Sequence, residues 1–350
     1  MRLDELYDQL SRTISALDFE RIWPGFTPLK FALYDDEHCV LDGSYIEKTD
    51  VFCANTSIVY QGEQIAIWNV AEEIKPAILA SKIVHEMFHG FQNRQGWDCW
   101  ADEMEALYRY AYSAGNLSLK LRENELLLSL LDGFDSVSFA ELLSLRRLRM
   151  ERNPYEFSYE SKVEEIEGSA NFVEWMVLKQ LDERAVHAME ARMRSLLTKP
   201  EYLFPIRISS YYTGALLIHA MIGAGVYSYN SAERPVIRTI LRGIRPSDGD
   251  FPGKDAYYQQ ARDAIAAFNK ASEAIITSAL EKNEVVVQGP VEVVCVNIYD
   301  ARCHKGYMMS RYFLQYRDSG GQKTIYGNFV LKMADEKTIA CVYRWDVPDD

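Results

Sequence analysis

Two histidines and a glutamate lie within five consecutive residues, in the segment His85-Glu86-Met87-Phe88-His89. In an α-helix, residues four positions apart lie on the same face, so His85 and His89 can present their imidazole rings to one metal ion. Glu86 lies beside the first histidine, where its carboxylate can reach a water molecule bound to that metal. The spacing therefore predicts two zinc ligands and a general base within a single helical turn.

The residues around this motif predict a largely buried helix. Pro76 suits the first turn of a helix, and Gly96 suits a stop just after its end. We therefore expect the motif on a rigid element, which can hold ligand atoms within about 0.2 Å of their required positions. Between Pro76 and Gly96, apolar side chains recur at helical spacing: Ile78, Leu79, Ile83, Val84, Met87, Phe88 and Phe91.

Catalytic zinc usually has three protein ligands and a water molecule, so a third ligand must come from another segment. None of the other four histidines follows the motif closely, which favours a carboxylate on a second helix. Glu167 is the best candidate, because the small residues at 168–170 would let its helix approach the histidine helix closely. Glu164, three residues earlier, and the acidic cluster at 102–105 are the alternatives.

His85-Glu86-x-x-His89 followed by Glu167-Gly-x-Ala-x-Phe resembles the gluzincin metallopeptidases, the clan of thermolysin and aminopeptidase N. The resemblance covers roughly residues 65–225. It implies a zincin-like catalytic domain with one Zn²⁺ held by His85, His89 and Glu167, and with Glu86 as general base. The chain departs from the clan in the long separation between His89 and Glu167, which an inserted helical hairpin at about 98–150 would explain.

A second resemblance lies in Tyr211-Tyr212-Thr213-Gly214-Ala215, which is similar to the Tyr-x-x-Gly-Ala segment of aminopeptidase-N-like enzymes. In those enzymes the tyrosine hydroxyl donates to the oxyanion of the tetrahedral intermediate. The resemblance implies this role for Tyr211, with Tyr212 as the alternative. Thr213 replaces the lysine that is usual there. The Gly-x-Met-Glu-Asn element that anchors a free amino terminus is absent from the sequence, which lowers the case for an aminopeptidase.

Supporting residues are expected around the ligands. Metal-bound histidines usually donate their other ring N–H to a carboxylate or carbonyl group. Asn171 and Glu174, which follow Glu167 on the same predicted helix, are candidates for this contact. His219 is either a second oxyanion donor or a buried structural histidine.

The remaining sequence predicts an α+β fold with a mainly helical catalytic domain. Residues 64–70 fit an edge strand that could bind an extended peptide, and Ser138-x-x-Glu141 is typical of a capping box that opens a helix. The expected zincin-like domain spans 1–283 and the expected C-terminal β-rich domain or terminal sheet, with five short strands, spans 284–350. Within the first, we expect a small mixed sheet at about 28–70, with strands at 28–34, 38–42, 51–60 and 64–70, and helices over about 74–282, including 158–182, 183–197, 208–223 and 255–282.

Composition limits the partners. The net charge of −13 disfavours nucleic acid and anionic membranes, and no run of about 18 apolar residues predicts a membrane-spanning helix. The amino-terminal segment lacks the apolar core of a secretory signal, and the six cysteines form no Cys-x-x-Cys pair. A cytoplasmic location is therefore expected, and the resemblance to metallopeptidases implies a peptide or protein substrate.

These patterns lead to one main hypothesis and two rivals. The main hypothesis is a zinc metallopeptidase, a hydrolase that cleaves peptide bonds with a metal-activated water and Glu86 as general base. One rival is a catalytically inactive zincin-fold protein that binds metal and serves as a binding or regulatory module. The other is a purely structural helix bundle in which the motif is accidental.

Overall fold

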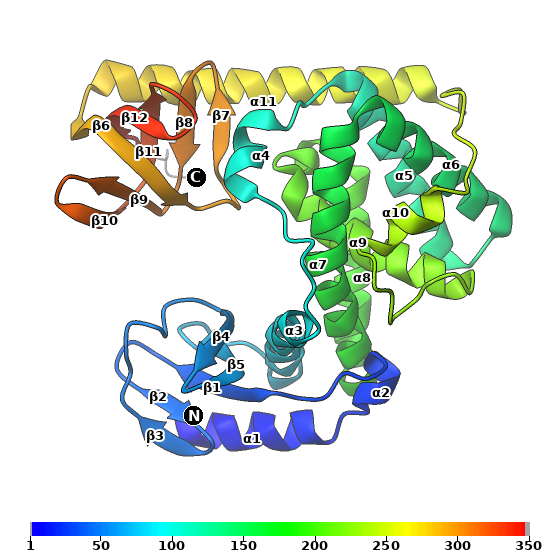
Figure 1. Cartoon of the computed structure of the whole chain (residues 1–350), viewed down its shortest axis with the longest axis horizontal. Helices are drawn as coiled ribbons and strands as arrows, with labels where there is room; N and C mark the ends of the chain where they lie inside the picture. Colours follow the sequence, from blue (N-terminus) through cyan, green and yellow to red (C-terminus); the bar gives the residue numbers. More distant parts are fainter. Residues whose placement is uncertain (1, 347–350) are drawn as a thin grey trace.

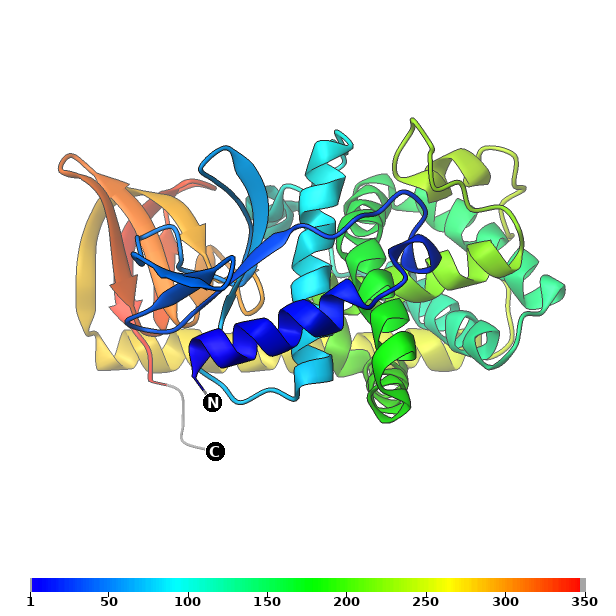
Figure 2. The ribbon, with the colours of Figure 1, turned by 90° about the horizontal axis from the view of Figure 1, so that it is seen from below.

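The computed structural model describes residues 2–346 and has an α+β fold with two separate sheets. Figure 1 shows the long helix α7 (Pro154–Leu181) in the middle of the molecule, with most of the other helices on one side and both sheets on the other. Figure 2, seen from below, shows the same division. The expected fold class is therefore confirmed at the level of α+β.

The expected small mixed sheet is present near the amino terminus. Its strand order is β3-β2-β1-β5-β4, with β1 parallel to β5 and the other pairs antiparallel. Helices α1 and α2 precede it, and the strands agree with the expected segments except for the unexpected β3. The bounds are α1 Leu3–Ser15, α2 Phe19–Ile22, β1 Lys30–Tyr34, β2 Cys39–Leu41, β3 Ser44–Ile46, β4 Thr56–Tyr60 and β5 Glu63–Asn69.

The prediction that residues 64–70 form an edge strand is wrong. Strand β5 lies between β1 and β4, and β4 is the edge strand. The cause is a tight hairpin: Gln61 and Gly62 both have positive φ, as a two-residue turn between twisted antiparallel strands requires. This turn folds β4 back onto β5 and leaves β4 with one free side.

The motif helix α3 (Pro76–Arg94) matches its expected bounds and packs against this sheet. Gly90 lies at the contact, where an added Cβ would be 2.4 Å from a Leu29 methyl group and 2.8 Å from side-chain atoms of Gln64 and Ser57. Because only glycine fits this spacing, the helix is held close to β4 and β5. The two histidines are therefore fixed relative to the edge strand.

Helix α7 is crossed by α9 (Ile206–Gly223) at a pair of glycines. A Cβ on Gly168 would lie 2.5 Å from the Gly214 Cα, so the two backbones touch there. The small residues after Glu167 were expected to admit the histidine helix. Gly168 instead allows the close approach of α9. Ser169 is the small residue that faces α3, and its hydroxyl accepts a 2.9 Å hydrogen bond from Gln92.

The expected insertion is the hairpin of α5 (Ala114–Asp132) and α6 (Ser136–Arg152). Ser138 was expected to cap the second helix, but the cap is Asp135, whose carboxylate accepts a 2.7 Å hydrogen bond from the Ser138 N–H. The helix is therefore capped by a side-chain oxygen, as expected, but three residues earlier than Ser138. The other helices of this region are α4 Glu103–Arg109, α8 Glu183–Thr198, η1 Pro200–Leu203, α10 Val236–Leu241 and α11 Lys254–Lys282.

The C-terminal sheet has seven strands rather than the expected five, in the order β10-β9-β6-β12-β11-β8-β7. Its core packs against α4 through Met104, Leu107 and Tyr108, and against the end of α11 through Ile276 and Ala279. No helix within residues 2–346 has the length and apolar character that crossing a membrane requires. The strands are β6 Val285–Val296, β7 Arg302–His304, β8 Tyr307–Ser310, β9 Phe313–Asp318, β10 Gly321–Tyr326, β11 Phe329–Met333 and β12 Thr338–Arg344.

Candidate metal centre

The structure brings His85, His89 and Glu167 together at the contact between α3 and α7. The two Nε2 atoms lie 3.2 Å apart, and the Glu167 Oε2 lies 3.4 Å from the His89 Nε2 and 3.9 Å from the His85 Nε2. Tetrahedral zinc with ligands at about 2.05 Å places those ligand atoms about 3.3 Å from one another. Two imidazole nitrogens and a carboxylate oxygen at these separations therefore fit a zinc ion with little movement.

The outer ring nitrogens point to groups that hold the imidazoles in place. The His89 Nδ1 lies 2.8 Å from the Gln92 Oε1, and the Gln92 amide donates to the backbone oxygen of Ile166 on α7 at 2.8 Å. The His85 Nδ1 lies 3.3 Å from the Glu174 Oε2. Both rings thus turn Nε2 toward Glu167, in the orientation that metal binding needs.

This arrangement partly matches the expected supporting residues. Glu174 lies where it was expected, whereas Asn171 lines the same cleft and makes no hydrogen bond to either histidine in the described chain. Gln92 was not predicted. Its position three residues after His89, on the same helical face, is a signal that could have identified it.

Glu167, the expected third ligand, is anchored by an arginine. Arg207, on α9, donates to the Glu167 Oε1 at 2.8 Å and also to Glu103, which accepts a 2.7 Å hydrogen bond from the Tyr159 hydroxyl. These contacts leave the Glu167 Oε2 directed at the histidines. Arg207 was not predicted as a site residue, although it lies four residues before Tyr211, one helical turn away.

The alternative third ligands are engaged elsewhere. Glu164 pairs with Arg146 and Lys120 in the interior of the helical region. In the acidic cluster at 102–105, Asp102 caps α4 and Glu103 is held by Arg207. Glu167 is therefore the carboxylate that faces the two histidines.

Electrostatics in the site favour a positive charge between the ligands. Burial lowers the pKa of His85, but its contacts with Glu167 and Glu174 outweigh burial and raise that pKa to about 10. Burial opposes ionisation of Glu167, yet His89 and His85 hold its pKa well below the usual range. A divalent cation bound between these side chains would be attracted by the same carboxylates that favour a proton on the imidazoles.

Glu86 faces a cleft of about 920 Å³ that also contains the three ligands. Burial raises the pKa of its carboxyl group, against the lowering effect of His85 and His89. Within residues 2–346, no group donates a hydrogen bond to this carboxylate. The side chain is therefore available to accept a proton from a molecule in the cleft.

Both tyrosines of the α9 segment line this cleft. The Tyr211 hydroxyl lies 3.2 Å from the hydroxyl of Tyr299, which comes from the loop after β6. Burial and the charge of Glu167 raise the pKa of Tyr211, so its hydroxyl keeps its proton. His219 is not among the residues that line the cleft and instead packs edge-on against Trp175, with ring centres 5.2 Å apart.

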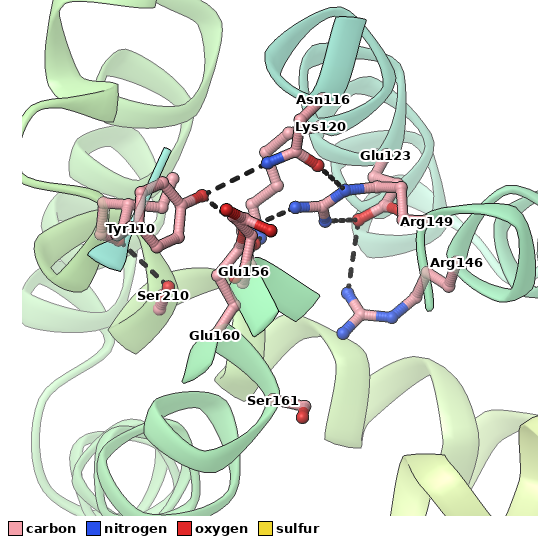
Figure 3. A network of polar contacts seen from close by, with 12 residues as sticks. Tyr110, Asn116, Lys120, Glu123, Arg146, Arg149, Glu156, Glu160, Ser161 and Ser210 are labelled. Carbon is pink, nitrogen blue, oxygen red and sulfur yellow. Dashed lines mark hydrogen bonds and ion pairs between the residues drawn. The ribbon is translucent and has the colours of Figure 1, made fainter. Parts of the chain in front are cut away.

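A buried ring of six charges joins α7, the helix of Glu167, to the two helices of the insertion. Figure 3 labels its members except Glu164. Helices α5, α6 and α7 contribute two charged side chains each, and acid and base alternate around the ring. Each side chain is at most 2% exposed. In order, the members are Lys120, Glu160, Arg149, Glu123, Arg146 and Glu164, which pairs again with Lys120. The insertion is thereby fixed to the helix of Glu167.

Replacing Glu174 with glutamine should weaken zinc binding about 10- to 100-fold, because the His85 ring loses the carboxylate that orients it. The measurement is competitive zinc titration against a chromophoric chelator. The control is Glu183→Gln, which changes a carboxylate that is 91% exposed. An unchanged zinc affinity in Glu174→Gln would show that this contact does not support the ligand.

Compared with known proteins, the chain matches no protein-family model, no curated protein and no solved structure.

Proposed function

We propose that this protein is a zinc-dependent peptidase. The observation that carries the proposal is the convergence of His85, His89 and Glu167 in a cleft that also holds the unpaired carboxylate of Glu86. When bound there, zinc would polarise a substrate carbonyl and lower the pKa of a coordinated water toward neutrality. The resemblance to gluzincins is supported by the placement of the third ligand on a helix packed against the histidine helix.

Glu86 is the proposed general base. Its buried carboxylate has a raised pKa and faces the cleft, so it can take a proton from the attacking water and deliver that proton to the leaving amine. Both transfers use the same two oxygen atoms. The helix around Glu86 is fixed against the sheet at Gly90, which keeps the base in place between the two steps.

Tyr211 is the proposed oxyanion donor. Its hydroxyl stays protonated because its pKa is raised, and the guanidinium of Arg207 lies 5.2 Å from the centre of its ring. A neutral phenol beside a cation can donate to an oxygen that develops negative charge. Tyr212 also lines the cleft and remains the alternative.

The edge strand β4 is the proposed docking surface for an extended substrate. Residues 55–57 line the cleft, and β4 has no strand partner on its outer side among residues 2–346. An extended peptide can add to such an edge by main-chain hydrogen bonds. Residues 64–70 were expected in this role, but they lie in the interior strand β5, so we propose β4 instead.

Zinc reconstitution tests the proposal. Metal-free protein should bind one zinc ion, and cleavage of a mixed peptide library, followed by mass spectrometry, should appear with that ion. His89→Ala should lose both properties. His187→Ala, a change at a side chain that is 71% exposed, should keep them. Binding of one zinc ion without cleavage of any peptide would favour an inactive, metal-binding regulatory protein, and absence of stoichiometric zinc would favour a structural bundle.

A further inference from the structure

A second cavity, of about 480 Å³, lies between the helical region and the C-terminal sheet. Its walls come from α4, from Tyr159 of α7, from residues 204–207, from Phe268 of α11, and from the segment 298–311 of the C-terminal region. Its volume is typical of sites that enclose small organic ligands. Tyr299 lines both this cavity and the cleft of the metal centre, so the two share a wall.

Three residues of the cavity walls carry buried hydrogen-bond donors that lack acceptors. The Tyr108 hydroxyl and the Nε atoms of Arg207 and Arg311 are buried, and none of them has a hydrogen-bond partner within residues 2–346. All three residues line the cavity. Buried donors without acceptors are uncommon in folded proteins, and three of them in the walls of one space add to the positive character of these walls.

Arg302 adds a positive charge without a counter-ion. Its guanidinium stacks over the Phe268 ring at 5.2 Å, and no carboxylate of residues 2–346 lies within ion-pair distance of it. Burial lowers the pKa of Arg302 and outweighs the raising effect of Asp300, which lies beyond ion-pair distance. A bound anion would supply the absent counter-charge.

The acidic groups near the cavity are already engaged. Glu103 accepts from Arg207 and Tyr159, and Asp300 accepts a 3.0 Å hydrogen bond from Asn297. Asp300 is also 3.9 Å from Arg311, which is at the limit of an ion pair. The charge left uncompensated in the cavity walls is therefore positive.

The rest of the lining is about half aromatic, and most of its other residues are aliphatic. Rings of this kind bind planar or apolar groups and make a fully hydrated ion a poor occupant. Besides Phe268 and Tyr299, the aromatic residues of the walls are Tyr108, Tyr110, Tyr112, Tyr159, Phe204, Tyr307 and Trp345.

We propose that the second cavity binds an organic carboxylate with an aromatic or apolar body. The carboxylate would pair with Arg302, and the body would lie against the aromatic and aliphatic walls. One guanidinium without a counter-ion matches a single negative charge. The carboxylate can come from the carboxyl-terminal end of a substrate peptide or from a free small acid.

Calorimetric titration of the metal-free full-length chain tests the site without peptidase activity. The probes are N-acetylphenylalanine and its amide, which share one apolar body and differ in charge. The acid should bind at least about tenfold more tightly than the amide, as for hydrogen bonds to charged groups. Arg302→Gln should remove this difference. Arg317→Gln, which changes an exposed arginine of the same sheet that pairs with Glu292, should preserve it.

Three results would overturn the proposal: equal binding of the acid and the amide, full acid binding in Arg302→Gln, or tighter binding of phenyl phosphate than of N-acetylphenylalanine. The first two would deny the anion site, and the third would assign it to phosphates. All three results come from binding measurements, so they can be obtained whether or not the chain is a peptidase.

A kinetic comparison identifies the source of the carboxylate and rests on the proposed function. Peptides are compared as free acids and as C-terminal amides. If the substrate end occupies the cavity, Arg302→Gln should raise KM at least about tenfold for the acids and leave the amides unchanged. If a free acid is the ligand, KM should be the same for both peptide forms, while Arg302→Gln still loses N-acetylphenylalanine binding in calorimetry.

Discussion

Glu86→Gln is expected to retain one zinc ion and to lose a factor of about 10² to 10⁴ in kcat, the usual contribution of a general base. Glutamine has nearly the same shape but cannot accept the proton of the attacking water. Because Glu86 is not among the three groups that face one another as ligands, zinc affinity should stay within a fewfold of the native value. Stoichiometric zinc and peptide cleavage are measured on the same sample.

The matched control is Glu72→Gln, an exposed carboxylate in the loop before α3. It should leave both zinc content and kcat unchanged. Native activity in Glu86→Gln would assign proton transfer to another group. Loss of zinc in that variant would instead make Glu86 part of the metal site.

Removing one charge from the buried ring should produce the largest loss of stability in the molecule. Glu164→Gln leaves Arg146 and Lys120 with one counter-charge fewer in an interior where their side chains are fully buried. Breaking a buried ion pair in this way costs about 3–5 kcal/mol of unfolding free energy. The measurement is denaturant unfolding monitored by circular dichroism.

The control for this change is Glu151→Gln, which removes an exposed partner of Arg147. Exposed pairs contribute about 0–1 kcal/mol, so this variant should unfold near the native midpoint. Equal destabilisation by the two substitutions would mean that the ring does not stabilise the fold.

The same ring predicts a pH dependence of stability. Burial opposes ionisation of Glu164, but Arg146 and Lys120 outweigh it and lower its pKa from 4.5 to about 2. Because the folded-state pKa is depressed, this carboxylate stabilises the fold fully above its unfolded pKa of about 4.5. That contribution is lost as the pH falls from about 4.5 to about 2. Unfolding measured across this range should show a smaller acid loss in Glu164→Gln than in the native chain.

The part of the site that the sequence predicts best is the part set by local spacing. His85, Glu86 and His89 lie within one turn of an amphipathic helix, so their relative positions follow from helix geometry alone. Glu167 required the resemblance, because many residues separate it from the motif. Arg207 escaped prediction because nothing in the chemistry of its own segment indicates that it anchors a carboxylate on another helix.

The strand order and the second cavity could not be predicted from local sequence patterns. Residues 64–70 have the composition of a strand, but only the turn at Gln61 and Gly62 decides that β4 takes the edge. Short strands such as β3 and β7 have three residues each, too few for an alternating pattern to stand out. Arg302 gains its environment from α11 and from distant loops, which no periodicity within β7 reveals.

The charge ring also gives α7 a fixed register. Each helix in it supplies two charges three or four residues apart. Sliding α7 by one turn so that Glu164 took the place of Glu160 would put Gly168 in the place of Glu164 and leave a cation in the interior unmatched. Sliding it the other way would bring Glu164 to the place of Gly168, where a Cβ would meet the Gly214 backbone. Both shifts are unfavourable, so the ring and the glycine contact together favour one register of α7. Glu167, three residues further on, is thereby preset opposite the histidines. A metal ion would find the three side chains already in place, so its binding should require dehydration of the ion and release of the His85 proton rather than rearrangement of the chain.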